Sequence, residues 1–500
     1  MILNNSIFKF SFCLVFLTVS FNFQAETKVV SNITSANIIA PITISTDGVF
    51  LRDNKPYYGI GINYFNAFYR TIQNNYDKTY TYGLKYLGEN KIPFIRFSVN
   101  GFWANELLLY KNNKTLYFSL LDQFVASAET NNIGLIPSLF WSYAAVPDLM
   151  GEHINQWGNP NSKTIAFMRT YTTDLVSRYK NSPAILGWEF GNEVNAYCDL
   201  LDQAINFLPK VNVMQGTPAS RTIEDAMTTS ILQVALNEFA KTIRLIDPDR
   251  PIFSGNSTPA SNMYHRYKFG NWNTDSSTDF TLLLDAQNPI SLGTLGLHLY
   301  PYQEKTLFSD FYPRATITQV IQEAMRSSLE LKRPFFLGEF GSPKTLGTVA
   351  EAAKFQEFLN AIVDKKVQLS ALWVYDYSPQ DAEWNITQAN SRKYQLDAII
   401  NANKQFLVSA GNVEIKDQNL NYSVYPNPAK DFIQLKVNAS SSASHRMSYM
   451  LFDLQGKLIE SDKIESELTN VSIKELDPSV YFIKLVVDNE EVKVFRILKK

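Results

Sequence analysis

Two glutamates that end apolar, aromatic runs are the residues of this sequence best suited to chemistry. Glu193 closes the run Gly187-Trp188-Glu189-Phe190-Gly191-Asn192-Glu193, and Glu339 lies in Pro334-Phe335-Phe336-Leu337-Gly338-Glu339-Phe340-Gly341. Neither has a Lys or Arg as a near sequence neighbour. A carboxylate at the end of a buried strand is costly to bury, which argues against an ordinary solvated role. Glycoside hydrolysis requires two such carboxylates, one as acid/base and one as nucleophile or second base.

The elements that would position these glutamates begin near residue 57, where short apolar runs start to alternate with helix-like stretches. Repeated β/α alternation implies parallel strands, and eight units predict an α/β fold of the (β/α)₈ TIM-barrel type. The predicted strands are 57–65, 93–99, 133–140, 184–190, 251–254, 295–300, 334–339 and 369–375. The predicted helices are 78–89, 116–130, 164–180, 224–246, 317–331, 349–364 and 391–403, and the Asp/Ser/Thr/Asn-rich stretch 268–289 gives the weakest helical signal.

On this assignment Glu193 ends the fourth strand and Glu339 the seventh, so both lie at the barrel mouth, where such barrels carry their active sites. Asn192 offers an amide donor to a sugar hydroxyl. Arg96 ends the second strand, where a buried guanidinium needs a carboxylate partner. Placed beside Glu339, it would keep that nucleophile ionised. Glu189 lies deeper than Glu193 on the same face, and we interpret it as the structural partner of a buried Arg or Lys.

Three further residues end strands at the same mouth. His298 and Tyr300 end the sixth strand two residues apart, so they face the same side. The Tyr300 hydroxyl could hydrogen-bond the nucleophile. Trp373 ends the eighth strand and could form the floor of the pocket for the reacting sugar.

Other aromatic residues follow strand ends without a defined role. Trp103, Trp141 and Tyr143 are each either a sugar platform or loop packing, and Trp384 has the same two interpretations. Aromatic residues make up 13% of the chain, which suits stacking on sugar rings but also suits core packing.

The ordered motifs Asn192-Glu193, His298-Leu299-Tyr300, Gly338-Glu339-Phe340-Gly341 and Trp373 resemble glycoside hydrolase family 5, a member of the large clan of retaining (β/α)₈ glycosidases. The resemblance covers roughly residues 42–406. It implies that Glu193 is the acid/base and Glu339 the nucleophile. It also implies a set of residues that line the sugar subsite next to the cleaved bond: Arg96, Asn192, His298, Tyr300 and Trp373.

The sequence departs from this family at two positions. Val194 follows the acid/base glutamate where many members have Pro, and Ser138-Leu139-Phe140-Trp141 ends the third strand where many have a His. The sugar backbone therefore stays open between mannan and glucan, although Trp188–Glu193 is somewhat similar to the β-mannanase branch.

The expected activity is a secreted, retaining β-glycoside hydrolase that cleaves a β-1,4-linked polysaccharide by double displacement. We expect no metal or organic cofactor, because the four histidines and the one cysteine outside the leader, Cys198, lack ligand spacing. Two alternatives remain: an exo-β-glycosidase or transglycosylase of the same fold, and a non-catalytic surface glycan-binding barrel. We also expect a monomer, and the net charge of −2 gives no indication of nucleic-acid binding.

The N-terminus has the pattern of a signal peptide over residues 1–25, with Lys9, an apolar run from Phe10 to Phe21, and Ala25 as a cleavage residue. The following domain is predicted to span 26–408. Residues 42–54 are predicted to form a small hairpin that plugs the bottom of the barrel.

The end of the chain has a different pattern. Residues 409–421 are predicted as a linker and 422–500 as a small β-sandwich. Tyr425-Pro426-Asn427-Pro428-Ala429, Leu451–Lys457 and Tyr481–Leu485 resemble, in this order, the C-terminal sorting domain of type IX secretion. The resemblance implies recognition by the type IX machinery and export through the periplasm of a Gram-negative bacterium to the cell surface or medium. The alternative is a carbohydrate-binding sandwich.

Overall fold

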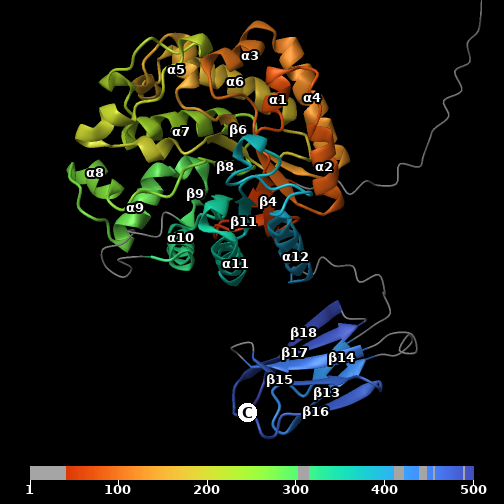
Figure 1. Ribbon diagram of the computed structural model, residues 1–500. Helices are drawn as coiled ribbons and strands as arrows, with labels where there is room; N and C mark the ends of the chain where they lie inside the picture. Colours follow the sequence, from red (N-terminus) through yellow and green to blue (C-terminus); the bar gives the residue numbers. More distant parts are fainter. Residues whose placement is uncertain (1–40, 302–314, 410–421, 438–446, 454–456, 488–489) are drawn as a thin grey trace, which may run out of the picture. The chain divides into compact units, whose positions relative to one another are not determined.

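The structure is a computed structural model that describes residues 41–301, 315–409, 422–437, 447–453, 457–487 and 490–500 (Figure 1). The predicted signal peptide and nearly all of the predicted linker lie outside these residues. None of the described helices combines the length and the hydrophobicity that a membrane span needs.

An eight-stranded parallel sheet forms the centre of the first module, as predicted. Its strands are β4 (Gly59–Asn63), β5 (Phe94–Ser98), β6 (Gly134–Phe140), β7 (Trp188–Gly191), β8 (Ile252–Phe253), β9 (Leu295–Leu299), β10 (Phe335–Phe340) and β11 (Leu369–Leu372). They pair in the order β8-β7-β6-β5-β4-β11-β10-β9.

The seam between the two edge strands, β8 and β9, is closed without a regular ladder. Thr294 Oγ1 donates to the carbonyl of Ile252 (2.5 Å), and the backbone N–H of Thr258 donates to the carbonyl of His298 (3.0 Å). The predicted barrel is therefore confirmed as a nearly closed one.

Helices surround this sheet (Figure 1). The outer helices are α2 (Tyr80–Glu89), α4 (Lys114–Thr130), α6 (Lys163–Tyr179), α7 (Thr229–Arg244), α9 (Ser277–Gln287), α10 (Ile317–Leu331), α11 (Thr348–Asp364) and α12 (Lys393–Ser409). Shorter helices, α1 (Tyr69–Gln73), α3 (Leu108–Asn112), α5 (Ala145–Met150) and α8 (Met263–Phe269), lie in the connections. In α10, buried Ile317, Val320, Ile321 and Ala324 recur at helical spacing and pack into the main core.

Two helices differ from their predicted form because of their N-caps. The Ser/Asp-rich start that weakened the prediction of α9 is its capping box: Ser276 Oγ accepts from the N–H of Asp279, and Asp279 accepts from the N–H of Ser276. Helix α7 begins at Thr229, later than predicted, because Thr228 caps it and residues Ile223–Asp225 form a separate 3₁₀ turn, η6.

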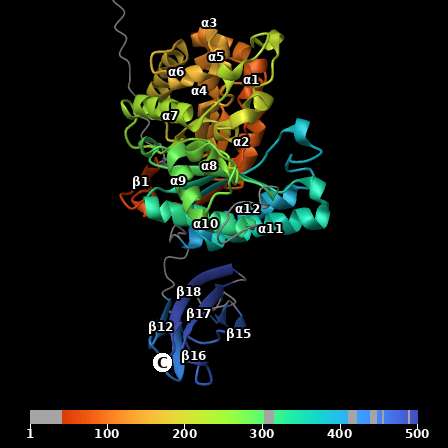
Figure 2. The ribbon, with the colours of Figure 1, turned by 90° about the vertical axis from the view of Figure 1, so that its left-hand side faces the viewer.

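The predicted hairpin is a three-stranded antiparallel sheet of β1 (Thr43–Ile44), β2 (Phe50–Arg52) and β3 (Lys55–Pro56), at the left of the barrel in Figure 2. Gln368, the residue before β11, exchanges two 2.9 Å hydrogen bonds with the backbone of Phe50. Ile42 and Phe50 share an apolar cluster with residues from the first halves of the barrel strands, including Phe94 and Phe336. The hairpin therefore covers the amino end of the barrel, as predicted.

The C-terminal module contains two antiparallel sheets, as predicted for a β-sandwich. One has the order β12-β13-β16 and the other β15-β14-β17-β18. Alternate residues of strands from both sheets, among them Ile433, Leu435, Leu451 and Ile483, form one buried core. The strands are β12 (Tyr422–Tyr425), β13 (Phe432–Val437), β14 (Met447–Phe452), β15 (Leu458–Lys463), β16 (Leu468–Ser472), β17 (Val480–Val487) and β18 (Glu490–Leu498).

Candidate active site

Two carboxylates converge at the carboxyl ends of β7 and β10. Glu193 follows β7, and Glu339 is the penultimate residue of β10. One carboxylate oxygen of each, together with a ring nitrogen of His298, lie within 4.8 Å of one another. The strand positions that the sequence predicted for these three residues therefore bring them into one cluster.

Glu339 lies in fixed, nearly dry surroundings, with its side chain only 4% exposed. Arg96 Nη1 donates to its Oε1 at 2.6 Å, and the Tyr300 hydroxyl donates to its Oε2 at 2.5 Å. Burial raises the pKa of Glu339, while Arg96 and the Tyr300 hydrogen bond oppose this rise. The two direct donors are arranged to stabilise the ionised form, which a nucleophile needs.

Arg96 is fully buried and organises the acidic groups around it. Its Nε donates to both carboxylate oxygens of Glu189 at 2.8 Å, so Glu189 is the partner of a buried arginine that the sequence suggested. It also donates to Asn63 Oδ1 (3.0 Å), Asn192 Oδ1 (2.9 Å) and the carbonyl of Gly191 (3.4 Å), and it lies 4.7 Å from the centroid of the Trp141 ring. The Asn192 oxygen is thus held by Arg96, and Asn192 is also one of the residues that line the cavity.

Glu193 has a less enclosed position than Glu339, with 30% of its side chain exposed. Its backbone is left-handed (φ 51°, ψ 30°), and its N–H donates to the carbonyl of Gly255 at 2.7 Å. A Cβ on Gly255 would lie 1.9 Å from the carbonyl oxygen of Gly191, so only glycine fits there. Burial raises the pKa of Glu193, and Arg96 and Ser257 partly oppose this. A raised pKa suits a carboxyl group that must donate a proton near neutral pH.

His298 contacts both carboxylates through one nitrogen. Its Nδ1 lies 3.1 Å from Glu193 Oε1 and 3.5 Å from Glu339 Oε1. Burial lowers the pKa of His298 to about 4, so the ring is neutral at physiological pH. Because Nδ1 faces two carboxylates, which accept hydrogen bonds, the tautomer that fits these contacts has its proton on Nδ1. Its Nε2 has no hydrogen-bond partner among the described residues and would lie 2.8 Å from a Cβ at Gly338. A side chain at Gly338 would therefore displace the ring.

Aromatic side chains line the cavity above the carboxylates. This cavity has a volume of about 380 Å³, which is within the usual range for small-ligand sites. Phe65, Trp141 and Trp373 pack as a cluster, with the Phe65 ring centroid 5.2 Å from each indole and the two indoles 6.4 Å apart. Trp373 Nε1 donates to Gln380 Oε1 at 2.9 Å. The lining comprises Phe65, Phe102, Trp141, Asn192, Glu193, Tyr300, Glu339, Trp373, Tyr377, Gln380 and Trp384.

Sequence reasoning missed four of these lining residues: Phe65, Phe102, Tyr377 and Gln380. Phe65, Phe102 and Tyr377 each follow the carboxyl end of a barrel strand by a few residues, and that position is the signal that could have found them. Trp384, for which the sequence allowed either a sugar platform or loop packing, lines the cavity. Its ring centroid lies 5.0 Å from that of Tyr300.

Trp103, a candidate sugar platform from the sequence, is not among the residues that line this cavity, and its part in substrate binding stays a prediction. It lines a neighbouring cavity, of about 490 Å³, together with Tyr143. Trp103 has an extended backbone (φ −118°, ψ 156°), in which adjacent side chains point to opposite sides, so it turns away while Phe102 lines both cavities.

Among the described residues, the only group of potential metal ligands at this distance from one another is Glu193, His298 and Glu339. The Arg96 guanidinium already supplies a positive charge 2.6 Å from Glu339, which disfavours a second cation at the same carboxylate. The arrangement is better suited to proton transfer and nucleophilic attack.

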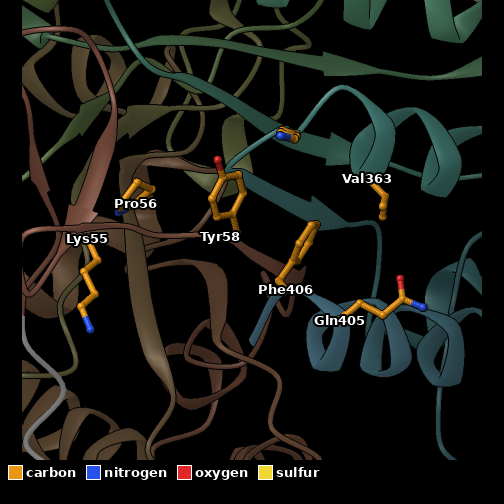
Figure 3. A pocket seen from close by; sticks show the side chains of 7 residues that line it. Lys55, Pro56, Tyr58, Val363, Gln405 and Phe406 are labelled. Carbon is orange, nitrogen blue, oxygen red and sulfur yellow. The ribbon is translucent and has the colours of Figure 1, made fainter. Parts of the chain in front are cut away.

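Figure 3 shows a further cavity, of about 440 Å³, whose lining includes neither of these carboxylates. Tyr58, which stacks on Phe406 of α12, directly precedes β4, so this cavity is at the amino end of that strand. Two lysines, Lys55 and Lys366, are its charged lining residues. It brings no pair of carboxylates together and is not part of the catalytic cluster.

Comparisons with known proteins agree with this architecture. The secretion system C-terminal sorting domain matches residues 423–500, so the second module is an export signal and the protein is secreted or displayed at the cell surface. Among curated proteins, none matches the chain.

Solved structures with a similar fold have low sequence identity. An endo-β-1,4-mannanase from Thermotoga petrophila is 15% identical, with 89% of this chain and 98% of that one covered and a TM-score of 0.50. A family 5 mannosidase from Rhizomucor miehei is 13% identical (74% and 99% covered, TM-score 0.52). An exo-β-1,4-mannosidase from Opitutaceae bacterium strain TAV5 is 16% identical (73% and 63% covered, TM-score 0.50).

The catalytic module has a direct family match. The cellulase family, glycosyl hydrolase family 5, matches residues 52–381, which include every strand of the barrel and both carboxylates. The chain is therefore a glycoside hydrolase that belongs to glycosyl hydrolase family 5.

Proposed function

We propose that this protein is a retaining β-glycosidase that cleaves a β-1,4-linked polysaccharide, with Glu339 as nucleophile and Glu193 as acid/base. The observation that carries this proposal is the separation of the two carboxylates, whose facing oxygens lie within 4.8 Å. Retaining enzymes hold their carboxyl groups about 5–5.5 Å apart, whereas inverting enzymes leave about 6.5–9.5 Å for a water molecule.

In the first step Glu339 attacks the anomeric carbon while Glu193 protonates the leaving oxygen. The C–O bond of the glycosidic link breaks, and an ester bond between the sugar and Glu339 forms. Tyr300 and Arg96 favour the ionised form of Glu339 and orient it for attack through their 2.5 and 2.6 Å hydrogen bonds. The raised pKa of Glu193, due to burial, favours its protonated form at the start of the reaction.

In the second step Glu193, now ionised, takes a proton from water, and the water oxygen attacks the anomeric carbon. The ester to Glu339 breaks, and the sugar leaves with net retention. His298 stays neutral through both steps because its pKa is lowered to about 4, so it can donate Nδ1–H to whichever carboxylate carries charge.

A β-1,4-mannan backbone is the first substrate to test, because the three similar solved structures named above carry mannan-degrading activities in their names. β-1,4-Glucan is the second, because the matching family is described as cellulase. A product profile on mannan, glucomannan, cellulose and mixed-linkage glucan distinguishes them. The same profile distinguishes endo action, which releases a mixture of oligosaccharides, from exo action, which releases a single small product.

Exo action remains a second candidate for a structural reason. Phe65, Trp141 and Trp373 are under 10% exposed and stack on one another, so they form a solid wall on one side of the catalytic cavity. A single small product would favour this alternative. A non-catalytic glycan-binding barrel is disfavoured, because such a protein has no need of the paired carboxylates.

Replacement of Glu339 with Ala tests the mechanism. Turnover of an activated aryl β-glycoside is expected to fall by at least about 10⁴-fold, because the covalent step loses its nucleophile. Added azide can attack from the vacated face and should restore turnover, with a glycosyl azide of inverted configuration as product. Unchanged hydrolysis by the variant contradicts the assignment.

We also propose that residues 1–25 direct export to the periplasm and are removed, and that the type IX machinery then recognises residues 422–500. Periplasmic retention of a chain truncated after residue 421 is the expected result.

A further inference from the structure

The turn that carries Glu193 is joined to the connection after β8 by one buried amide. Asn195 is the second residue of the 3₁₀ turn η3 (Val194–Tyr197), which begins directly after Glu193, and it is fully buried. Its Oδ1 accepts from the N–H of Ser257 at 2.8 Å, and its Nδ2 donates to the carbonyl of Ser257 at 2.9 Å. These two hydrogen bonds fix the distance between the turn and Ser257, much as a pair of ladder bonds joins two strands.

Further hydrogen bonds oppose any other orientation of this amide. Asn195 Nδ2 also donates to Oε1 of Gln287, the last residue of α9, at 2.9 Å. Asn256 Nδ2 donates to the backbone carbonyl of the same glutamine at 2.7 Å. Since Asn195 Oδ1 faces an N–H donor and its Nδ2 faces two oxygens, a flip of the amide would leave buried polar groups unpaired. The network therefore holds Ser257 in one place.

The same connection is also tied to the backbone on both sides of the charge cluster. The N–H of Glu193 donates to the carbonyl of Gly255 at 2.7 Å, and the N–H of Thr258 donates to the carbonyl of His298 at 3.0 Å. Ser257 is buried and lies between these two anchored residues in the chain. Its position relative to Glu193 is therefore fixed by the backbone as well as by the amide of Asn195.

From this position the Ser257 side chain hydrogen-bonds the carboxyl group of Glu193. A hydroxyl that donates to a carboxylate favours its ionised form, so this contact opposes the rise in the pKa of Glu193 that burial causes. The other charged or titratable groups that face Glu193 come from other elements: Arg96 from β5, Tyr197 from η3, His298 from β9 and Glu339 from β10. Because Ser257 is uncharged, its removal changes one hydrogen bond and leaves all these charges in place.

We propose that Ser257 is a positioning residue for the acid/base, and that Asn195 holds Ser257 in place. The hydroxyl orients the carboxyl group of Glu193 and donates to the carboxylate that remains once the proton has moved to the leaving oxygen. In the second step the same hydrogen bond holds this carboxylate while it takes a proton from water. This inference rests on the proposed function for the role of Glu193, but the contact between the two side chains can be tested without hydrolysis.

The experiment compares Ser257→Ala with Ser254→Ala, a matched control that removes another buried hydroxyl of the same connection. The Ser254 hydroxyl donates to Asn288 Oδ1 at 2.6 Å and not to Glu193. The pH dependence of kcat/KM is measured on an aryl β-glycoside with a poor leaving group. Independently of hydrolysis, NMR of protein labelled with ¹³C at the glutamate carboxyl groups measures the pKa of Glu193, whose signal is identified by its absence from Glu193→Gln.

Ser257→Ala is expected to raise the pKa of Glu193, and with it the alkaline limb of kcat/KM, by about 0.5–1 pH unit, because one hydrogen bond to the carboxylate is lost. Ser254→Ala should move neither. Asn195→Ala should move both in the same direction as Ser257→Ala, and the double variant should move them little further, because both changes remove the same contact.

Equal values of the Glu193 pKa in the two serine variants would overturn the inference, and so would an alkaline limb that stays in place while the pKa measured by NMR rises. Full additivity of the Asn195 and Ser257 changes would refute the part assigned to Asn195. A raised pKa in Ser257→Ala, with no hydrolysis of any β-glycoside by the parent protein, would leave the contact standing and refute the proposed function.

Discussion

The two sides of the catalytic cavity are built in different ways. On the Glu339 side, every direct partner comes from a barrel strand or the residue after it: Arg96 from β5, His298 from β9, and Tyr300 just beyond β9. On the Glu193 side, the carboxylate lies outside its strand in a left-handed turn, is 30% exposed, and is followed by the long segment 198–227.

On the proposed function, this difference assigns the chemistry to one side of the cavity and the selectivity to the other. On the Glu339 side, backbone hydrogen bonds between the barrel strands fix the positions of these residues, so Glu339 and its partners are held in one geometry. The loop side is where substrate length and identity can change without disturbing that cluster. Three substitutions test this division, each with a different readout.

Glu193→Gln is expected to have the largest effect. It should lower kcat/KM by about 10²–10⁴-fold for substrates with poor leaving groups, because general acid catalysis is lost. Substrates with a dinitrophenyl leaving group, which needs no protonation, should retain most of their kcat/KM. A uniform loss across leaving groups would mean that Glu193 is not the acid.

The same variant tests the pH dependence. Burial raises the pKa of Glu193, so the group stays protonated to a higher pH than a free carboxyl group, and activity should fall as the pH rises through that value. Glu193→Gln should therefore lose the alkaline limb of the kcat/KM profile and keep the acidic limb. If the variant keeps an alkaline limb, even at a shifted pH, then a group other than Glu193 is responsible for that limb.

Arg96→Met should mainly affect stability. The variant leaves Glu189 and Glu339 buried without their cation, which costs about 3–5 kcal/mol of unfolding free energy. Arg96 lowers the pKa of Glu339, so its removal raises that pKa further, and the deficit should shrink as the pH falls and the carboxyl group is protonated. Denaturant titrations at pH 4 and pH 7 measure this, with Arg178→Met, an exposed ion-pair residue, as control.

Tyr300→Phe should have the smallest of the three effects. It removes one hydrogen bond to a charged group, worth about 1.5–3 kcal/mol, so kcat/KM should fall by roughly 10- to 100-fold. Because this hydrogen bond lowers the pKa of Glu339, the acidic limb of the pH profile should move to higher pH. An unchanged acidic limb would contradict the role of Tyr300 as a donor to the nucleophile.

The sequence determined the barrel, its strand order along the chain and the identity of the central cluster. Apolar runs of strand length, separated by amphipathic helices, are a local property, and residues at their carboxyl ends must meet at one mouth. This is why Arg96, Glu193, His298, Tyr300 and Glu339 could be grouped before any contact was known.

Only the tertiary structure decided what surrounds that cluster. The cavity is lined by Phe65, Tyr377 and Gln380, which the sequence did not indicate, whereas Trp103 lines the neighbouring cavity. The reason is that connections after strands adopt paths that hydrophobic periodicity does not encode. The backbone bridge between Cys198 and Met227 and the Arg221–Asp148 pair link residues far apart in sequence, and such contacts form only once the barrel brings neighbouring connections together.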